Sequence, residues 1–245
     1  MSARVLTVSP EDWLKKAMSS KSSASRARYA RLGLATRAPL DKTTQAMLLR
    51  QLYLSLFEDE KFDDARKVAA QAVELGVLRD VLLQDAARAA LAQGDLEAAL
   101  SDLRAAARYC PASRRAFHHW TLGSILFLAQ RYEEAESALT RAARWGTHDK
   151  PLYRAHLLLC QIASGGSSPD DVQEAFERLQ EAPCGQGYGR FVLGHLAYAA
   201  GQWRIAQRHL EAFVRKTTEA TKLQSLALRG ELSMAKATLA KMAAN

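Results

Sequence analysis

The feature that most constrains this sequence is a helical hairpin that recurs along it. In residues 116–149, two apolar-periodic segments, 117–129 and 132–145, are separated only by the polar pair Gln130 and Arg131. A break of this length leaves room for nothing but a tight turn, so the two segments predict a pair of antiparallel helices.

Small and large apolar residues alternate along the expected contact between these two helices. Gly123, Ala135 and Ala142 recur at helical spacing beside Leu126 and Leu139. Small residues let two helices approach closely, and larger side chains fill the space next to them. The pattern therefore predicts a close-packed seam inside the hairpin.

The same hairpin recurs at a nearly constant interval. Counting 34 residues on from Ala65 reaches Ala99, and the equivalent alanines further along are Ala135, Ala175 and Ala206. The predicted hairpins cover residues 46–79, 80–113, 116–149, 150–186 and 187–220, with an insertion at 165–169 in the fourth. A period of this length indicates stacked helical repeats.

The repeat resembles the tetratricopeptide (TPR) repeat. The residues that carry this resemblance are Leu122-Gly123 in a first helix, the turn sequence Arg131-Tyr132-Glu133-Glu134-Ala135, and Pro111 at a repeat end. It covers residues 46–220 and implies an all-α, right-handed solenoid of about five helical hairpins with extra terminal helices. Residues 1–45 fit poorly and are a possible degenerate repeat, and residues 221–245 are expected to form capping helices around Gly230.

The resemblance also implies a function. TPR proteins are typically adaptors or scaffolds, and the first helices of successive hairpins line a concave groove that binds a partner. In this register the groove residues are Arg50, Phe57, Arg88, Phe117, Trp120, Phe127, Arg154, Tyr188, Phe191, His195 and Tyr198. Aromatic anchors beside arginine forks favour an apolar partner segment with acidic residues. Each ring can instead pack between hairpins, because core and groove share one helical spacing.

Charge is concentrated at one end of the chain. Residues 1–45 contain nine Lys or Arg against three acidic residues, whereas the whole chain has a net charge of +8. The expected basic patch consists of Lys15, Lys16, Lys21, Arg26, Arg28, Arg31 and Arg37. An alternative function is therefore docking on nucleic acid or an acidic membrane surface. A solvated basic helix face is the simpler interpretation, since no nucleic-acid motif accompanies it.

Catalytic and cofactor motifs are missing from the sequence. It contains no Gly-x-Ser-x-Gly, phosphate-loop, His-Glu-x-x-His or Cys-x-x-Cys pattern. The segment 185–190 resembles a dinucleotide loop, but Arg190 replaces the last glycine and no strand precedes it. His156 and Cys160 lie one helical turn apart without a carboxylate cluster beside them. We therefore expect no enzyme activity, no cofactor and no metal site.

Composition places further bounds on the protein. A hydrophobic content of 48% excludes wholesale disorder. No apolar run reaches the roughly 18 residues of a spanning helix, and the first ten residues lack the apolar core of a secretory signal. Cys110, Cys160 and Cys184 are odd in number and widely separated, which favours reduced thiols. These features predict a cytoplasmic protein, and the high alanine and arginine content is typical of a bacterial one.

Overall fold

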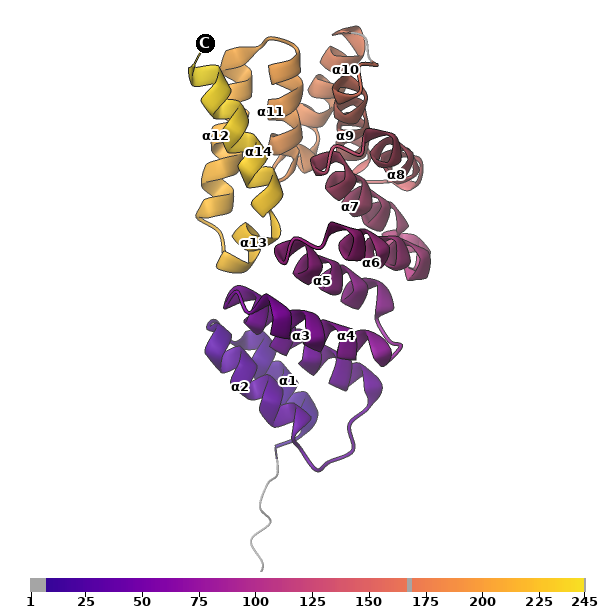
Figure 1. Ribbon diagram of the computed structural model, residues 1–245, viewed down its shortest axis with the longest axis vertical. Helices are drawn as coiled ribbons and strands as arrows, with labels where there is room; N and C mark the ends of the chain where they lie inside the picture. The colour runs from indigo at the N-terminus through magenta and orange to yellow at the C-terminus, as the bar shows by residue number, and fades with distance from the viewer. Residues whose placement is uncertain (1–7, 167–168, 245) are drawn as a thin grey trace, which may run out of the picture. The chain divides into compact units, whose positions relative to one another are not determined.

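The computed structural model describes residues 8–166 and 169–244. Its contacts divide the chain into a first unit, Met1–Tyr109, and a second unit, Cys110–Asn245. Within the described residues every regular element is helical, and successive helices pack in antiparallel pairs (Figure 1). The expected all-α fold of about five TPR-like hairpins with extra terminal helices is confirmed.

Polar side chains define helix starts in the first unit. Its helices are α1 (Pro10–Ser19), α2 (Ser23–Leu34), α3 (Lys42–Glu58), α4 (Phe62–Glu74), α5 (Arg79–Ala92) and α6 (Leu96–Tyr109). At the start of α1, Ser9 accepts a hydrogen bond from the backbone N–H of Asp12. At the start of α3, Asp41 accepts from the N–H groups of Thr43 and Thr44. Hydrogen bonds, above all with Thr44, hold the pKa of Asp41 below its usual value.

The second unit continues with the same construction. Its helices are α7 (Arg115–Leu128), α8 (Tyr132–Trp145), α9 (Lys150–Ala163), α10 (Pro169–Glu181), α11 (Gly189–Ala199), α12 (Trp203–Thr218), α13 (Lys222–Ala227) and α14 (Arg229–Ala243). Short 3₁₀ turns, Ala112–Arg114 and Pro183–Gly185, precede α7 and α11. The expectation that Gly230 separates the last two helices is wrong, because α13 ends before Leu228 and Gly230 lies inside α14.

One residue in each hairpin turn adopts the left-handed conformation. These residues are Glu60, Gly94, Gln130, Gly165 and Gly201, with φ between 59° and 90°. The following N–H group then bonds to a carbonyl five residues earlier, as from Arg131 to Leu126 at 2.9 Å. This geometry satisfies carbonyls at the end of the first helix. Its recurrence shows that the first helices of all five hairpins end with the same capping geometry.

Replacing Gln130 with glycine is expected to raise the free energy of unfolding by about 0.5–1 kcal/mol. A side chain at positive φ costs about 1–2 kcal/mol, and the extra freedom of glycine in the unfolded chain offsets part of that gain. The matched change Gly94→Ala puts a Cβ into open space at a φ of 81°. It is expected to lower stability by about 1 kcal/mol. Urea denaturation measures both, and shifts of the same sign would contradict this account.

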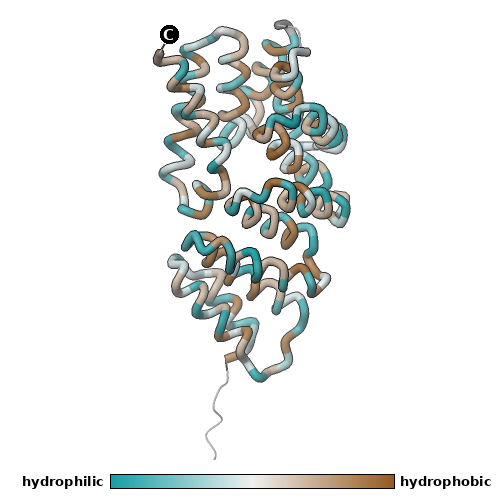
Figure 2. Tube along the Cα trace, in the orientation of Figure 1, coloured by the Kyte–Doolittle hydropathy of each residue, from teal (hydrophilic) through white to brown (hydrophobic). Residues whose placement is uncertain are grey.

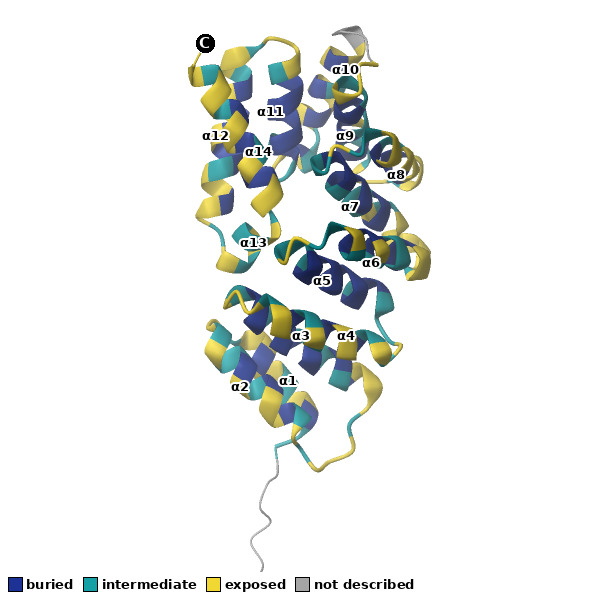
Figure 3. Cartoon of the chain, in the orientation of Figure 1, coloured by how far each residue is buried: buried dark blue, intermediate teal, exposed yellow. Residues whose placement is uncertain are grey.

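The seam inside the hairpins is as tight as the small residues predicted, except in the fourth hairpin. A Cβ on Gly123 would lie 2.6 Å from Leu139, and one on Gly194 would lie 2.6 Å from Leu210. Ala175, in the fourth hairpin, is instead half-buried and lines a cleft. Burial concentrates on the first helices of hairpins, including α5, α7 and α11 (Figure 3), which also carry apolar stretches (Figure 2).

Candidate partner-binding site

Aromatic side chains from four helices of the second unit form one cluster. The ring of Trp120 lies edge to face on Tyr188, with centroids 4.7 Å apart, and its centroid is 5.9 Å from that of Tyr153. Phe191 lies 5.5 Å from Tyr188 and 5.4 Å from Phe213. Such separations are favourable for aromatic pairs. We call Trp120, Tyr153, Tyr188, Phe191 and Phe213 the aromatic cluster.

The residues of this unit that the sequence assigned to a groove differ in how far they are buried. Those in the core are Phe127, Phe191 and His195, which are 3%, 0% and 4% exposed. Those that are half-buried are Trp120, Tyr188 and Tyr198, and Phe117 is exposed. Access for a partner is therefore greatest at the edge of the cluster and at Phe117.

Two buried histidines lie against the aromatic cluster. Trp120 Nε1 donates a hydrogen bond to Nδ1 of His156 at 3.2 Å. Burial, reinforced by the charge of His195, lowers the pKa of His156 to about 3. Burial also lowers the pKa of His195 to about 4. Both imidazoles are thus neutral at pH 7, and they bring no positive charge to the cluster.

The last helix covers part of this cluster. Helix α14 packs on α12 and reaches α11 and α7, where Gly230 lies against Leu128. The Tyr188 hydroxyl donates a hydrogen bond to Glu231 Oε1 at 3.3 Å. Glu231 is only 4% exposed and Leu232 only 9%. Burial first, and then the Glu231 charge, raise the pKa of Tyr188 well above its usual value. A helix whose buried face combines the acid Glu231 with Leu232 and Ala235 therefore contacts Tyr188.

In the first unit, the two predicted arginines share one buried carboxylate. Arg50 Nε lies 2.7 Å from Asp85 Oδ2, and Arg88 lies 3.1 Å from Asp85 Oδ1. Because two guanidinium groups meet one carboxylate, the group keeps one excess positive charge. Phe57 is only 2% exposed and packs on Tyr53 at 5.7 Å. Burial and then Asp85 raise the pKa of Tyr53.

Arg154 lies in a cleft inside the fourth hairpin. The cleft has a volume of ≈ 660 Å³ and is lined only by residues of α9, α10 and the turn before α9. Leu158 and Ala175 contribute apolar surface, and Glu174 and Arg178 contribute charge. Arg154 therefore lines a cleft formed by its own hairpin.

Several side chains of the basic N-terminal segment have local partners. Arg26 binds Glu58 at 2.6 Å, with both side chains largely buried. Lys15 pairs with Asp12 at 3.8 Å, and Lys16 lies 4.6 Å from the centroid of the Trp13 ring. The exposed members are Lys15, Lys16, Lys21, Arg28, Arg31 and Arg37.

The glycine-rich segment before α11 serves close backbone packing. A Cβ on Gly185 would lie 2.1 Å from the carbonyl oxygen of Leu179, and one on Gly189 would lie 2.1 Å from that of Cys184. In residues 8–166 and 169–244, no group of three or more His, Cys, Asp or Glu side chains is placed to hold a metal ion. Among the helices of this described part, none is long and apolar enough to cross a membrane.

Comparisons with known proteins add little. No protein-family model matches the sequence, and no curated protein matches it. Among solved structures, the chain is similar to a TPR repeats protein from Bacteroides fragilis NCTC 9343, with 13% identity and a TM-score of 0.37. The match covers 92% of this chain and 99% of that one. Similarity at this level carries no argument about function.

Two residues of the candidate site escaped sequence reasoning. Asp85 and Glu231 are both buried acids, 1% and 4% exposed. Asp85 precedes Ala86, and Glu231 precedes Leu232. Both acids occupy positions at which the helical period predicts an apolar side chain. A buried acid is expected to have a partner, so an acid at such a position was the available signal.

Proposed function

We propose that this protein is a non-catalytic interaction adaptor that binds an apolar helical segment carrying an acidic residue. The observation that supports this proposal is the contact between the Tyr188 hydroxyl and Glu231 of α14, at 3.3 Å. Because α14 is itself such a segment, its contacts indicate the chemistry that a partner helix needs. Helix-in-groove recognition uses anchors on one helical face, as Leu232 and Ala235 are on α14.

The partner helix takes the place of α14 on the aromatic cluster. The buried face of α14 consists of Glu231, Leu232, Ala235 and Thr238. Alanine and threonine bury little apolar area, and hydrophobic stabilisation scales with that area. A partner with larger apolar residues at the same spacing gains more from Trp120 and Tyr188 than α14 does.

The first unit, taken by itself, carries a second group suited to acidic side chains. Arg50 and Arg88 flank the buried Asp85, and the excess positive charge of this group is complementary to a carboxylate on the partner. Hydrogen bonds between guanidinium and carboxylate groups are about twice as strong as neutral ones. No contact among the described residues favours docking through the basic N-terminal segment, and Arg26 of that segment is bound to Glu58.

The α14 sequence itself is the probe for this proposal. In a chain carrying Glu231→Lys and Leu232→Lys, α14 is expected to leave its site, because two lysines cannot be buried there unpaired. A fluorescent peptide of residues 229–243 is then expected to bind that variant at least about tenfold more tightly than the wild-type chain, where α14 competes intramolecularly. Fluorescence anisotropy measures the affinity.

A conservative change tests whether the peptide binds at this site or associates with the protein non-specifically. Tyr188→Phe in the same background removes only the hydroxyl that donates to Glu231. It is expected to weaken the peptide about tenfold, since hydrogen bonds to charged groups contribute about 1.5–3 kcal/mol. Circular dichroism checks that the helices persist. Equal peptide binding by the wild-type, displaced and Tyr188→Phe chains would refute the proposal.

A further inference from the structure

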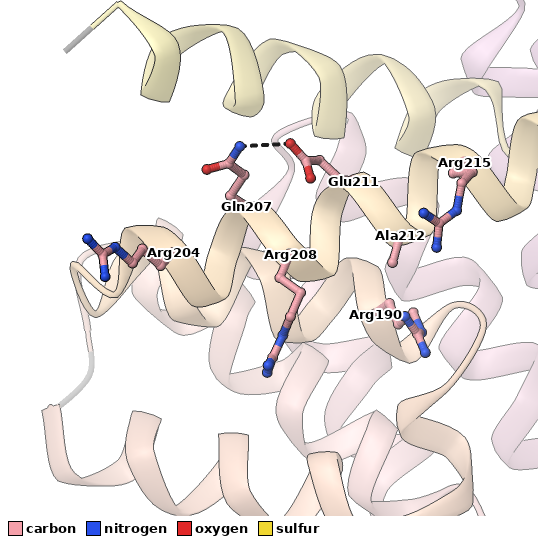
Figure 4. A pocket seen from close by; sticks show the side chains of 7 residues that line it. All are labelled: Arg190, Arg204, Gln207, Arg208, Glu211, Ala212 and Arg215. Atoms are coloured by element: carbon pink, nitrogen blue, oxygen red, sulfur yellow. Dashed lines mark hydrogen bonds between the residues drawn. The ribbon is translucent and has the colours of Figure 1, made fainter.

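Four arginines surround a hollow on the second unit that the proposed function does not use. The hollow has a volume of ≈ 340 Å³ and is lined by Arg190, Arg204, Gln207, Arg208, Glu211, Ala212 and Arg215 (Figure 4). Arg190 belongs to the first turn of α11, and the other lining residues belong to α12. We call this hollow the arginine pocket.

The charge of the arginine pocket is poorly balanced. Its lining holds four guanidinium groups against one carboxylate, that of Glu211. Glu211 accepts a hydrogen bond from Gln207 at 2.8 Å, and both point toward α14, whereas Arg208 leaves α12 on the other side (Figure 4). Within the described part of the chain, none of the four arginines forms an ion pair. Their charges therefore remain available to an anionic ligand.

The arginine side chains are arranged in a way that suits a row of anions. Arg204, Arg208 and Arg215 lie four and seven residues apart, on one face of α12, which spaces them about 6 Å and about 10 Å along the helix axis. Arg190 is held in place because its Nε and NH2 groups both donate to Gln186 Oε1, at 3.1 Å and 2.6 Å. A partly fixed guanidinium loses less conformational entropy when it binds.

The chemistry of the lining selects the kind of anion. Arginine forks pair with carboxylates and phosphates in bidentate geometry. Single-stranded nucleic acids usually also need aromatic surfaces on which bases stack, and the lining contains no aromatic residue. In an extended peptide, side chains on the same side recur about every 7 Å, close to the spacing of Arg204 and Arg208.

We propose that the arginine pocket binds an acidic peptide segment of a partner, with phosphates or carboxylates at alternate residues. The pocket is formed by α11 and α12 and uses neither Trp120 nor Tyr188. Failure of this proposal is therefore distinguishable from failure of the proposed function, because the two sites are tested with different peptides and different variants.

The test compares short fluorescent peptides at about 150 mM salt, where only short-range electrostatic contacts persist. One peptide carries phosphoserine at alternate positions, a second glutamate and a third glutamine. We expect saturable binding of at least one of the first two and none of the third. Arg208→Glu with Arg215→Glu is expected to weaken that binding at least about tenfold.

A matched variant controls for net charge. Arg141→Glu with Arg144→Glu changes the charge by the same amount on exposed positions of α8 and is expected to alter affinity less than about twofold. Equal losses in the two variants would overturn the proposal, since they would indicate a diffuse effect of net charge. Absence of binding by both acidic peptides, or their displacement by a lower concentration of oligo-dT than of unlabelled peptide, would also overturn it.

Discussion

Between pH 7 and pH 5, His156 and His195 are together expected to lower the stability of the second unit by about 4 kcal/mol. Burial also lowers the pKa of His119, to about 4, and that of His209, so both add to this loss. His156 and His195 are buried, with pKa values lowered to about 3 and about 4, whereas an unfolded histidine has a pKa of about 6.5. Below that value the unfolded chain binds protons that the folded chain does not, so stability falls as the pH falls. The 1.5 pH units from 6.5 to 5 cost about 2 kcal/mol for each histidine.

Urea denaturation at the two pH values measures this loss. The variant His156→Gln keeps an acceptor for the Trp120 N–H group but does not titrate, so the loss between pH 7 and pH 5 is expected to shrink by about 2 kcal/mol. His148→Gln, at an exposed position, serves as the control and is expected to leave the loss unchanged. If His156→Gln and the wild-type chain lost stability equally, His156 would not be buried in its neutral form.

Truncation of Phe191 to alanine is expected to lower the free energy of unfolding of the second unit by about 3–5 kcal/mol. The side chain is fully buried, with ring centroids 4.6 Å from His195 and 5.4 Å from Phe213. Removing the ring loses its transfer free energy and leaves a cavity that the surrounding helices fill only in part. Thermal and urea denaturation measure the effect.

Phe117→Ala is the matched control for Phe191→Ala. Phe117 was assigned to the same groove by sequence but is 39% exposed, so its truncation is expected to cost less than about 1 kcal/mol. If Phe191→Ala left stability unchanged and abolished binding of the α14 peptide, Phe191 would be a partner anchor and not a core residue.

Helical geometry limits how much of the candidate site can be predicted from the sequence. The sequence assigned Trp120, Tyr188 and Phe191 to the groove as aromatic residues of first helices, and the structure brings them together in one cluster, with Tyr188 just before α11. Their exposure was beyond prediction, because neighbouring positions on a helix differ by only about 100° and a first helix has neighbours on several sides. Arg154 illustrates this limit, since it lines the cleft of its own hairpin.

The sequence by itself determined the helical hairpins and, outside the fourth hairpin, their seams. These depend on contacts within one repeat, such as Gly123 against Leu139, and on local backbone preferences, which a periodic pattern records directly. Only the tertiary structure decided that α14 meets Tyr188 through Glu231, that Asp85 joins Arg50 to Arg88, and that Arg190 lies beside α12. The contact of Glu231 with Tyr188 and that of Asp85 with Arg50 join residues of different hairpins, so their geometry is set by how the hairpins stack, which no single repeat encodes. Arg190 and α12 belong to one hairpin, and the three-dimensional packing of α11 on α12 brings Arg190 to the hollow.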